Sequence, residues 1–279
     1  MDISPVFLPA LGFLALGFAT GAYGTLIGAG GGFVLMPVLL LLFPNESPAL
    51  LTSISLAVVF VNAASGTEAY TAMRRVDFKT GIVFALASVP GALIGAVATS
   101  WLPRRTFDLI FGVALLAGAA FLMLRKPRPQ KPDTLDRPGL TTRRIVDRFG
   151  ETFEYSFSMR TGVIISVFVG FLSSFLGIGG GIIHVPAMVY LLGFPVHVAT
   201  ATSHFVLAVM AMAGTSMHIA TGEFAHGVHR TIYLALGVIV GAQVGAHLSN
   251  HIRGSFIIRS LALALGGVGL RILYLAMFG

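Results

Sequence analysis

Most of the chain consists of apolar segments about 20 residues long, the length of helix that crosses the hydrocarbon core of a bilayer. Lipid offers no water to the backbone, so each such segment must satisfy its N–H and C=O groups internally, as a helix. Only 10% of the residues are charged and 56% are hydrophobic, whereas a soluble domain has about 25% charged residues. The sequence therefore predicts an all-α polytopic membrane protein whose surroundings are the lipid bilayer.

A glycine-rich turn separates the first two segments in each half of the chain. Residues 28–32 read Gly-Ala-Gly-Gly-Gly, and residues 177–181 read Gly-Ile-Gly-Gly-Gly. Such a stretch breaks a helix, since each glycine costs about 1 kcal/mol relative to Ala. The segments after the turns, 33–43 and 182–192, are short helices that reach only about 17 Å and cannot cross the membrane. We therefore expect both turns near mid-depth, where a broken helix in each of two repeats indicates the binding site of a transporter.

The two turns belong to a duplication that covers nearly the whole of both halves. They lie 149 residues apart, and one inserted residue makes the later offset 150. With that offset Thr202 matches Thr52, and the Gly-x-x-x-Gly pair at Gly241 matches the pair at Gly91, a spacing that lets helices approach closely. Each half holds about five hydrophobic segments, at 6–27, 33–43, 49–70, 81–100 and 107–124 and then at 161–176, 182–192, 198–220, 231–248 and 256–277.

The relative orientation of the halves depends on how often each crosses the membrane. If the first two segments of a half form a hairpin, the number of crossings is odd and the repeats are inverted; if they form one broken crossing, the repeats are parallel. The basic loop with Arg74, Arg75 and Lys79 has a counterpart at 221–230 with one Arg and no Lys, which favours inversion. The loop at 102–105, with two arginines, points the other way. We expect inverted repeats.

The chain is predicted to divide into an N-terminal transmembrane repeat (1–124), a basic linker (125–160) and a C-terminal transmembrane repeat (161–279). The linker holds 9 of the 18 Lys and Arg residues, so we expect it in the cytoplasm. This explains the net charge of +7 without a nucleic-acid partner. Aromatic residues alternate with polar ones over 152–158, which indicates a small β-hairpin or, equally well, an irregular loop. The first five residues lack a basic region, so no cleaved signal peptide is expected.

The groups available near mid-depth suit a small anion. Nearly every Lys and Arg lies at a segment end or in a loop, and there is no buried carboxylate pair for a cation or a proton. Helix N-termini bind anions through free N–H groups and a partial positive charge of about +0.5. The candidate substrate-binding residues are the turn glycines and nearby polar side chains: Gly28, Gly30, Gly31, Gly32, Thr52, Ser53, Asn62, Gly177, Gly179, Gly180, Gly181, His184, Thr202, Ser203 and His204.

Each candidate also has a purely structural interpretation. The glycines could only permit close helix packing, the hydroxyls could donate to carbonyls of their own helices, and His184 and His204 could pack, shuttle protons or ligate a metal. The chain has no cysteine, no His-Glu-x-x-His pair, no convincing Ser-His-Asp arrangement and no phosphate-binding loop. We therefore expect no catalytic residue, resident metal or cofactor, and no enzyme activity.

The paired Gly-x-Gly-Gly-Gly turns, with Pro37 and Pro186 after them and a Thr-Ser helix start after each, resemble the TauE/SafE family of sulfite and organosulfonate exporters. The resemblance covers about residues 13–124 and 161–275. It implies a secondary transporter in the bacterial inner membrane that exports sulfite, sulfoacetate or related small anions. The alternatives are an anion channel of the same fold and, less favoured, a membrane-embedded enzyme. The oligomeric state stays open.

Overall fold

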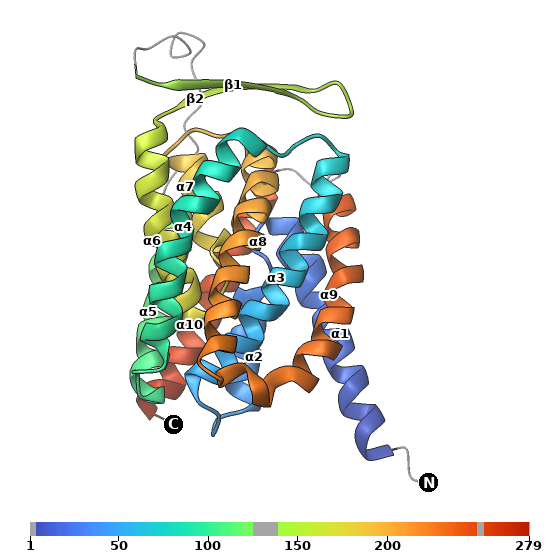
Figure 1. Ribbon diagram of the computed structural model, residues 1–279, viewed down its shortest axis with the longest axis vertical. Coiled ribbons are helices and arrows are strands. Elements are labelled where there is room, and N and C mark those ends of the chain that lie inside the picture. The colour runs from blue at the N-terminus through green and yellow to red at the C-terminus, as the bar shows by residue number, and fades with distance from the viewer. Residues whose placement is uncertain (1–3, 125–138, 250–253, 279) are drawn as a thin grey trace.

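Ten α-helices, one 3-10 helix and a two-stranded hairpin make up the described part of the computed structural model, which comprises residues 4–124, 139–249 and 254–278 (Figure 1). The start of the predicted linker, 125–138, lies outside the described residues. The first half contains α1 (Ser4–Ile27), α2 (Gly32–Leu42), α3 (Pro48–Ala72), α4 (Phe78–Thr99) and α5 (Arg104–Leu124). The hairpin of β1 (Thr141–Val146) and β2 (Thr152–Phe157) follows. The second half contains α6 (Met159–Leu176), α7 (Gly181–Tyr190), α8 (Val196–Ala220), η2 (Glu223–Gly227), α9 (Val228–Leu248) and α10 (Gly254–Phe278).

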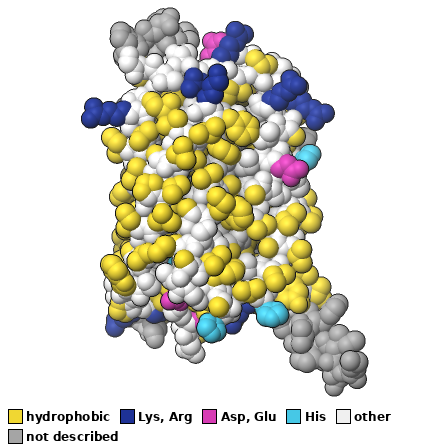
Figure 2. Space-filling model, viewed as in Figure 1, with side chains coloured by type: hydrophobic (Ala, Val, Ile, Leu, Met, Phe, Trp, Pro, Cys, Tyr) yellow, Lys and Arg dark blue, Asp and Glu magenta, His cyan; other side chains and the backbone are white. Residues whose placement is uncertain are grey.

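The helices are membrane spans by length and composition. Within the described residues, seven helices are long and apolar enough to cross a bilayer. On the face that Figure 2 shows, hydrophobic side chains cover the middle of the molecule while Lys and Arg gather at its two ends. This is the surface that a lipid bilayer requires, because charged side chains are costly at its centre. The predicted all-α polytopic membrane fold is therefore confirmed.

The repeats are inverted. In Figure 1, α1 begins at the end of the molecule far from the hairpin, whereas α6 begins directly beneath the hairpin. The short helices α2 and α7 each run back toward the end from which their half began, so the first two helices of each half form a hairpin. Each half therefore begins at one end of the molecule and finishes at the opposite end, as the inverted arrangement requires. We call the two ends of the molecule the hairpin end and the far end.

The halves interleave rather than stand side by side. The most extensive contacts join α1 to α9 and, symmetrically, α6 to α4, while α3 packs on α8 and α5 on α10. Glycines permit these approaches: a Cβ atom on Gly91 would lie 2.1 Å from the carbonyl oxygen of Val167, and one on Gly245 would lie 2.1 Å from that of Ala22. The division at 1–124, 125–160 and 161–279 stays a prediction.

The predicted β-hairpin is present and lies across the hairpin end (Figure 1). Its strands pair antiparallel, with Thr141 opposite Phe157 and Val146 opposite Thr152. The three alternating aromatic residues of β2 are buried. Tyr155 lies 4.4 Å, ring to ring, from Phe194 in the α7–α8 loop. The alternation seen in the sequence thus marks the face of the hairpin that packs on the helices.

Two buried polar contacts dock the hairpin on the loop between α3 and α4. The guanidinium of Arg75 donates to Asp147 Oδ2 at 2.8 and 3.0 Å, and both side chains are buried. Burial alone would raise the pKa of Asp147, but the hydrogen bonds from Arg75 and from two backbone N–H groups hold this pKa below its ordinary value. Tyr155 donates to Asp77 Oδ2 at 2.8 Å, while Asp77 caps the start of α4. Burial and the Asp77 charge raise the pKa of Tyr155, so its phenol stays protonated and remains a donor.

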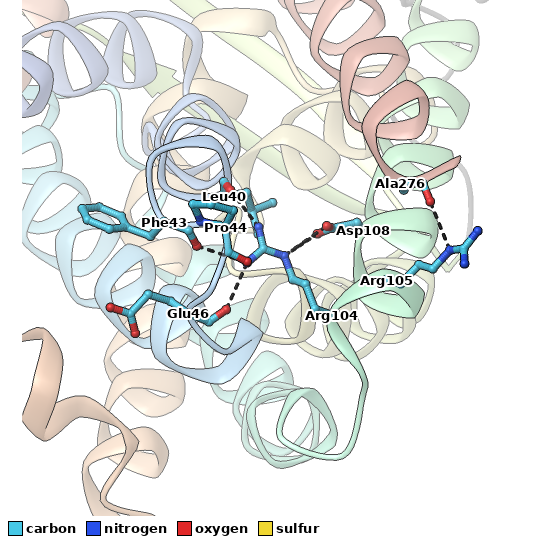
Figure 3. Close-up of polar contacts among 8 residues, drawn as sticks. All are labelled: Leu40, Phe43, Pro44, Glu46, Arg104, Arg105, Asp108 and Ala276. Atoms are coloured by element: carbon cyan, nitrogen blue, oxygen red, sulfur yellow. Dashed lines mark hydrogen bonds and ion pairs between the residues drawn. The ribbon is translucent and has the colours of Figure 1, made fainter. Parts of the chain in front are cut away.

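Arg104, at the far end, fastens the C-terminus of α2 (Figure 3). Its guanidinium donates to the carbonyl oxygen of Leu40 at 2.7 Å and to that of Glu46 at 3.0 Å, and it pairs with Asp108 at 3.0 Å. The last carbonyls of a helix carry partial negative charge, so a cation stabilises them. This structural role accounts for Arg104 at the far end, where the 221–230 loop has one Arg and no Lys.

Replacing Arg104 by Ala should lower the free energy of unfolding by about 2–3 kcal/mol, because several carbonyl oxygens and Asp108 lose a charged donor at once. Thermal unfolding in detergent micelles measures this change. Arg105 is the matched control, since its contact is one exposed hydrogen bond of 3.2 Å to the carbonyl of Ala276. Equal midpoints for the Arg104→Ala and Arg105→Ala proteins would contradict the assigned role.

Candidate functional site

Both glycine-rich turns adopt backbone conformations that other residues rarely tolerate. In the first turn Gly28, Gly30 and Gly31 have φ values of +83°, +73° and +77°. In the second turn Gly177 and Gly179 have φ values of +66° and +73°. Left-handed backbone of this kind is available to glycine at little cost. The glycine content therefore sets the path of the chain between each pair of antiparallel helices.

The two turns face each other and touch through their backbones. A Cβ atom on Gly32 would lie 2.4 Å from the carbonyl oxygen of Ile178. The symmetric contact is as close, because a Cβ on Gly181 would lie 2.2 Å from the carbonyl oxygen of Gly28. From the ends of the molecule, α2 rises about 16 Å and α7 about 15 Å to reach this point. The structure therefore brings the two sets of candidate glycines together, well inside the bundle.

The starts of α2 and α7 contribute N–H groups at this meeting point. The first helical hydrogen bonds of α2 run from Val34 and Leu35 to the carbonyl of Gly31. In α7 they run from Ile183 and His184 to the carbonyl of Gly180. The N–H groups that come earlier in each helix have no acceptor within their own helix. These are the groups with which a helix start binds an anion.

An apolar layer from α3 and α8 covers the turns in this conformation. A Cβ on Gly30 would lie 2.2 Å from Leu207, one on Gly179 would lie 2.8 Å from Val59, and one on Gly180 would lie 2.3 Å from Met210. These three covering side chains are themselves buried. Val59, Leu207 and Met210, which we call the apolar layer, therefore lie directly against the turns. The turn glycines are themselves buried, so a ligand reaches them only when packed side chains move.

The hydroxyl candidates mostly bond within the protein. Thr52 donates to the carbonyl of Pro48 at 2.8 Å and Ser53 donates to that of Leu50 at 2.7 Å, the local bonding that was the alternative interpretation of these residues. Thr202 accepts from the backbone N–H of Asp77 at 3.0 Å and so fastens α8 to the start of α4. Ser203 is buried and its hydroxyl has no hydrogen-bond partner. Of the four, Ser203 alone has no hydrogen-bond partner in this conformation.

Asn62 and His204 belong to a buried group that we call the hairpin-side cluster: Thr25, Asn62, Tyr70 and His204. Thr25 donates to Asn62 Oδ1 at 3.1 Å, and Tyr70 donates to the carbonyl of Thr25 at 2.8 Å. The His204 ring lies edge-on to Tyr70 at 5.4 Å. Asn62 Nδ2 and His204 Nε2 have no hydrogen-bond partner. His204 and Thr25 both lie against Gly66, since a Cβ there would be 3.0 Å from His204 Nε2 and 3.0 Å from Thr25 Cγ2.

Thr25 and Tyr70 are members of this cluster that the sequence did not indicate. A lone Thr or Tyr in an apolar helix has no pattern around it, and only the meeting of α1, α3 and α8 reveals the partners. The sole signal was position, because Thr25 lies three residues before the first turn.

His184 lies apart from His204. Its Nε2 is 3.3 Å from the hydroxyl of Ser166, and its ring lies edge-on to Phe84 at 5.8 Å. Its Nδ1 has no partner. Within the described residues, no three His, Asp or Glu side chains are grouped so that they could hold a metal ion. Within the same described residues, the buried Asp, Glu, Lys and Arg side chains are Arg75, Asp77 and Asp147. They lie at the hairpin end and not at the turns.

Comparison with known proteins agrees with this architecture. The model of a family described as "Sulfite exporter TauE/SafE" matches residues 13–272. "Probable membrane transporter protein YunE" of Bacillus subtilis is 33% identical over 273 residues, which cover 95% of this chain and 97% of that protein. A protein of Methanocaldococcus jannaschii, also named a probable membrane transporter, is 23% identical over 275 residues and 94% of each chain. No solved structure matches.

Proposed function

Because this chain belongs to the sulfite exporter TauE/SafE family and is a multi-pass membrane transporter rather than an enzyme, we propose that it exports small sulfur-containing anions. Sulfite, sulfoacetate and related organosulfonates are the substrate class. The observation that carries the proposal is the meeting of two helix N-termini at the facing glycine turns, well inside the bundle and away from Arg75, the buried cation of the described residues. A site of this kind recognises an anion through N–H groups and helix dipoles.

The substrate binds between the turns and is oriented by the donors that have no partner in the closed conformation. Asn62 Nδ2 and the Ser203 hydroxyl are such donors, and His204 Nε2 joins them when the imidazole takes up a second proton, because its Nδ1 already donates to the Thr200 carbonyl. Two of them belong to the hairpin-side cluster, between the first turn and the hairpin end. An unpaired buried donor is costly, and an oxyanion that accepts its hydrogen bond removes that cost.

Transport proceeds by alternating access around the turns. Movement of α3 relative to α8 withdraws the apolar layer from one side at a time, since both helices supply its side chains. The hairpin and linker face the cytoplasm, and the protein resides in the bacterial inner membrane. In that orientation the inside-negative potential favours anion export by about 2.3 kcal/mol per charge for every 100 mV.

Efflux from proteoliposomes tests the proposal. The vesicles are loaded in turn with sulfite, sulfoacetate and taurine, and the protein should release one or more of them with saturable kinetics. His204→Phe keeps a ring against Tyr70 but removes Nε2, which donates to the anion once the imidazole is protonated, so we expect substrate affinity to fall about tenfold. His247→Phe is the control, because the exposed His247 makes the same type of contact, from Nδ1 to the carbonyl four residues earlier, as His204 does.

Three outcomes would count against the proposal in different ways. If the protein moves none of sulfite, sulfoacetate and taurine, the substrate class is overturned. Unitary currents in planar bilayers would assign a channel in place of a carrier. Equal affinity in the His204→Phe and His247→Phe proteins would remove His204 from the site.

A further inference from the structure

A second buried polar group lies on the other side of the turns and takes no part in the site described so far. It consists of Ser173 and Ser174 in the last turn of α6 and of Thr215 and His218 in the C-terminal part of α8; we call it the far-side cluster. All four residues are buried, with exposed fractions of 0%, 0%, 8% and 1%. The three hydroxyls and His218 Nε2 have no hydrogen-bond partner.

Five buried hydroxyls of the described residues have no hydrogen-bond partner, and three of them, Ser173, Ser174 and Thr215, belong to this cluster; the other two are Thr200 and Ser203. Many other buried Ser and Thr side chains donate to a carbonyl three or four residues earlier, as Ser88 does to Ala85 and Ser166 does to Gly162. That bond is the usual way for a hydroxyl to be satisfied inside a helix. Ser173, Ser174 and Thr215 leave it unmade. Buried polar groups without a partner are uncommon, and a bound oxyanion or water would satisfy them.

Helices α6 and α8 approach each other closely at Ser174 and Gly214. A Cβ on Gly214 would lie 2.6 Å from the Ser174 hydroxyl. Thr215 follows Gly214 in the chain, and His218 lies one helical turn further along the same helix. Residues four apart share one face of a helix, so His218 extends the polar surface from Gly214 toward the far end.

The inverted repeat relates this cluster to the one at the hairpin side. Ser174 is the counterpart of Thr25 at the 149-residue offset. Thr25 approaches Gly66 of α3 just as Ser174 approaches Gly214 of α8. The two clusters lie on opposite sides of the turns and the apolar layer, because α3 runs toward the hairpin end and α8 runs away from it (Figure 1). At the hairpin side Asn62 accepts from the Thr25 hydroxyl, whereas the Ser174 hydroxyl stays unpaired.

We propose that the far-side cluster is a second binding site for a small oxyanion, the half-site through which the substrate leaves toward the far end. This rests on the proposed function. The cluster offers hydroxyl donors and an imidazole but no carboxylate, and such a set suits an anion better than a cation. One of its members, Ser174, is the repeat counterpart of Thr25 in the hairpin-side cluster. The substrate therefore passes from one cluster, across the turns, to the other.

The test measures sulfite transport from each side of oriented proteoliposomes separately. In the double variant Ser174→Ala/Thr215→Val, the half-saturating sulfite concentration at the far side should rise about tenfold or more, while that at the hairpin side should change less than twofold. In His204→Phe, the half-saturating sulfite concentration should rise at the hairpin side and change less than twofold at the far side. Ser88→Ala is the control, because its buried hydroxyl is already paired with the Ala85 carbonyl at 2.7 Å.

Thermal unfolding supplies a second readout. The double variant removes unpaired hydroxyls, so its midpoint should equal or exceed that of the unaltered protein, whereas Ser88→Ala should lower it slightly. The second site would be overturned, and the proposed function left intact, by one result. In it, the half-saturating sulfite concentration at the far side is unchanged in the double variant, while that at the hairpin side is still raised in His204→Phe. If the double variant lowers the thermal unfolding midpoint and reduces sulfite transport equally from both sides, its residues have a structural role and the second site is also overturned. If the unaltered protein moves no sulfite, sulfoacetate or taurine, both proposals fail together.

Discussion

Adding one methyl group at the start of either short helix, in Gly32→Ala or Gly181→Ala, should abolish transport and lower the free energy of unfolding by about 1–3 kcal/mol. The new Cβ would lie 2.4 Å from the Ile178 carbonyl oxygen in the first variant and 2.2 Å from the Gly28 carbonyl oxygen in the second. Both clashing atoms belong to the backbone, so no side-chain rotation relieves them. The turns must separate, and the N–H groups that we assign to the anion lose their common target.

Anion efflux and thermal unfolding, measured on the same preparations, check this expectation. Gly12→Ala is the control, since Gly12 also lies in a helix but a Cβ there meets no atom within 4 Å. Ala has the higher helix propensity, so this control should be neutral or slightly more stable. If Gly32→Ala and Gly181→Ala transport at the unaltered rate, the contact between the turns has no part in the mechanism.

The second large effect is expected at the hairpin end. Arg75→Ala leaves the buried Asp147 carboxylate without its guanidinium partner, and breaking a buried pair in this way costs about 3–5 kcal/mol. We expect the hairpin to detach from the α3–α4 loop and its backbone amides to exchange hydrogen rapidly. Hydrogen exchange with mass spectrometry over residues 139–158 measures this directly. Arg144→Ala is the control, because Arg144 pairs with Glu154 on the exposed face of the hairpin, where such pairs contribute about 0–1 kcal/mol.

In the unaltered protein, lowering the pH should weaken the same contact between Arg75 and Asp147. The folded-state pKa of Asp147 is held below its ordinary value, so this contact contributes its stability above the unfolded-state pKa of about 4 and loses it as the pH falls further. Fast exchange of the hairpin at pH 7 in the Arg144→Ala protein, or slow exchange at that pH in the Arg75→Ala protein, would contradict the assigned contact.

The sequence predicted those parts of the fold that repeat or alternate. The apolar segments, the breaks at the two glycine turns and the hairpin aromatics all carry a local pattern, and each appears in the structure. Arg104 shows where local reasoning misleads. Counted as a loop charge it argued against inverted repeats, yet its guanidinium is occupied by the backbone carbonyls at the end of α2. A charge count cannot distinguish such an anchor from a free cation.

The surroundings of the turns could not be predicted. Helices in lipid are apolar on every side, so periodicity does not show which residues face the interior. Nothing distinguishes Val59 or Leu207 from their apolar neighbours in the sequence, although both cover the turns. For the same reason the partner of Thr202 was hidden, because the Asp77 amide comes from another helix start 125 residues away in the chain. These contacts depend on which helices meet, and the inverted interleaving decides that.

That interleaving also dictates the order of events during synthesis. The main neighbour of α1 is α9, and about 200 residues separate the end of one from the start of the other. At typical translation rates α1 waits roughly 10–40 s in the bilayer before its partner exists. Likewise α4 waits for α6. The nascent first half therefore holds its close-packing glycine surfaces open to lipid, and the bundle closes only after α9 has been made.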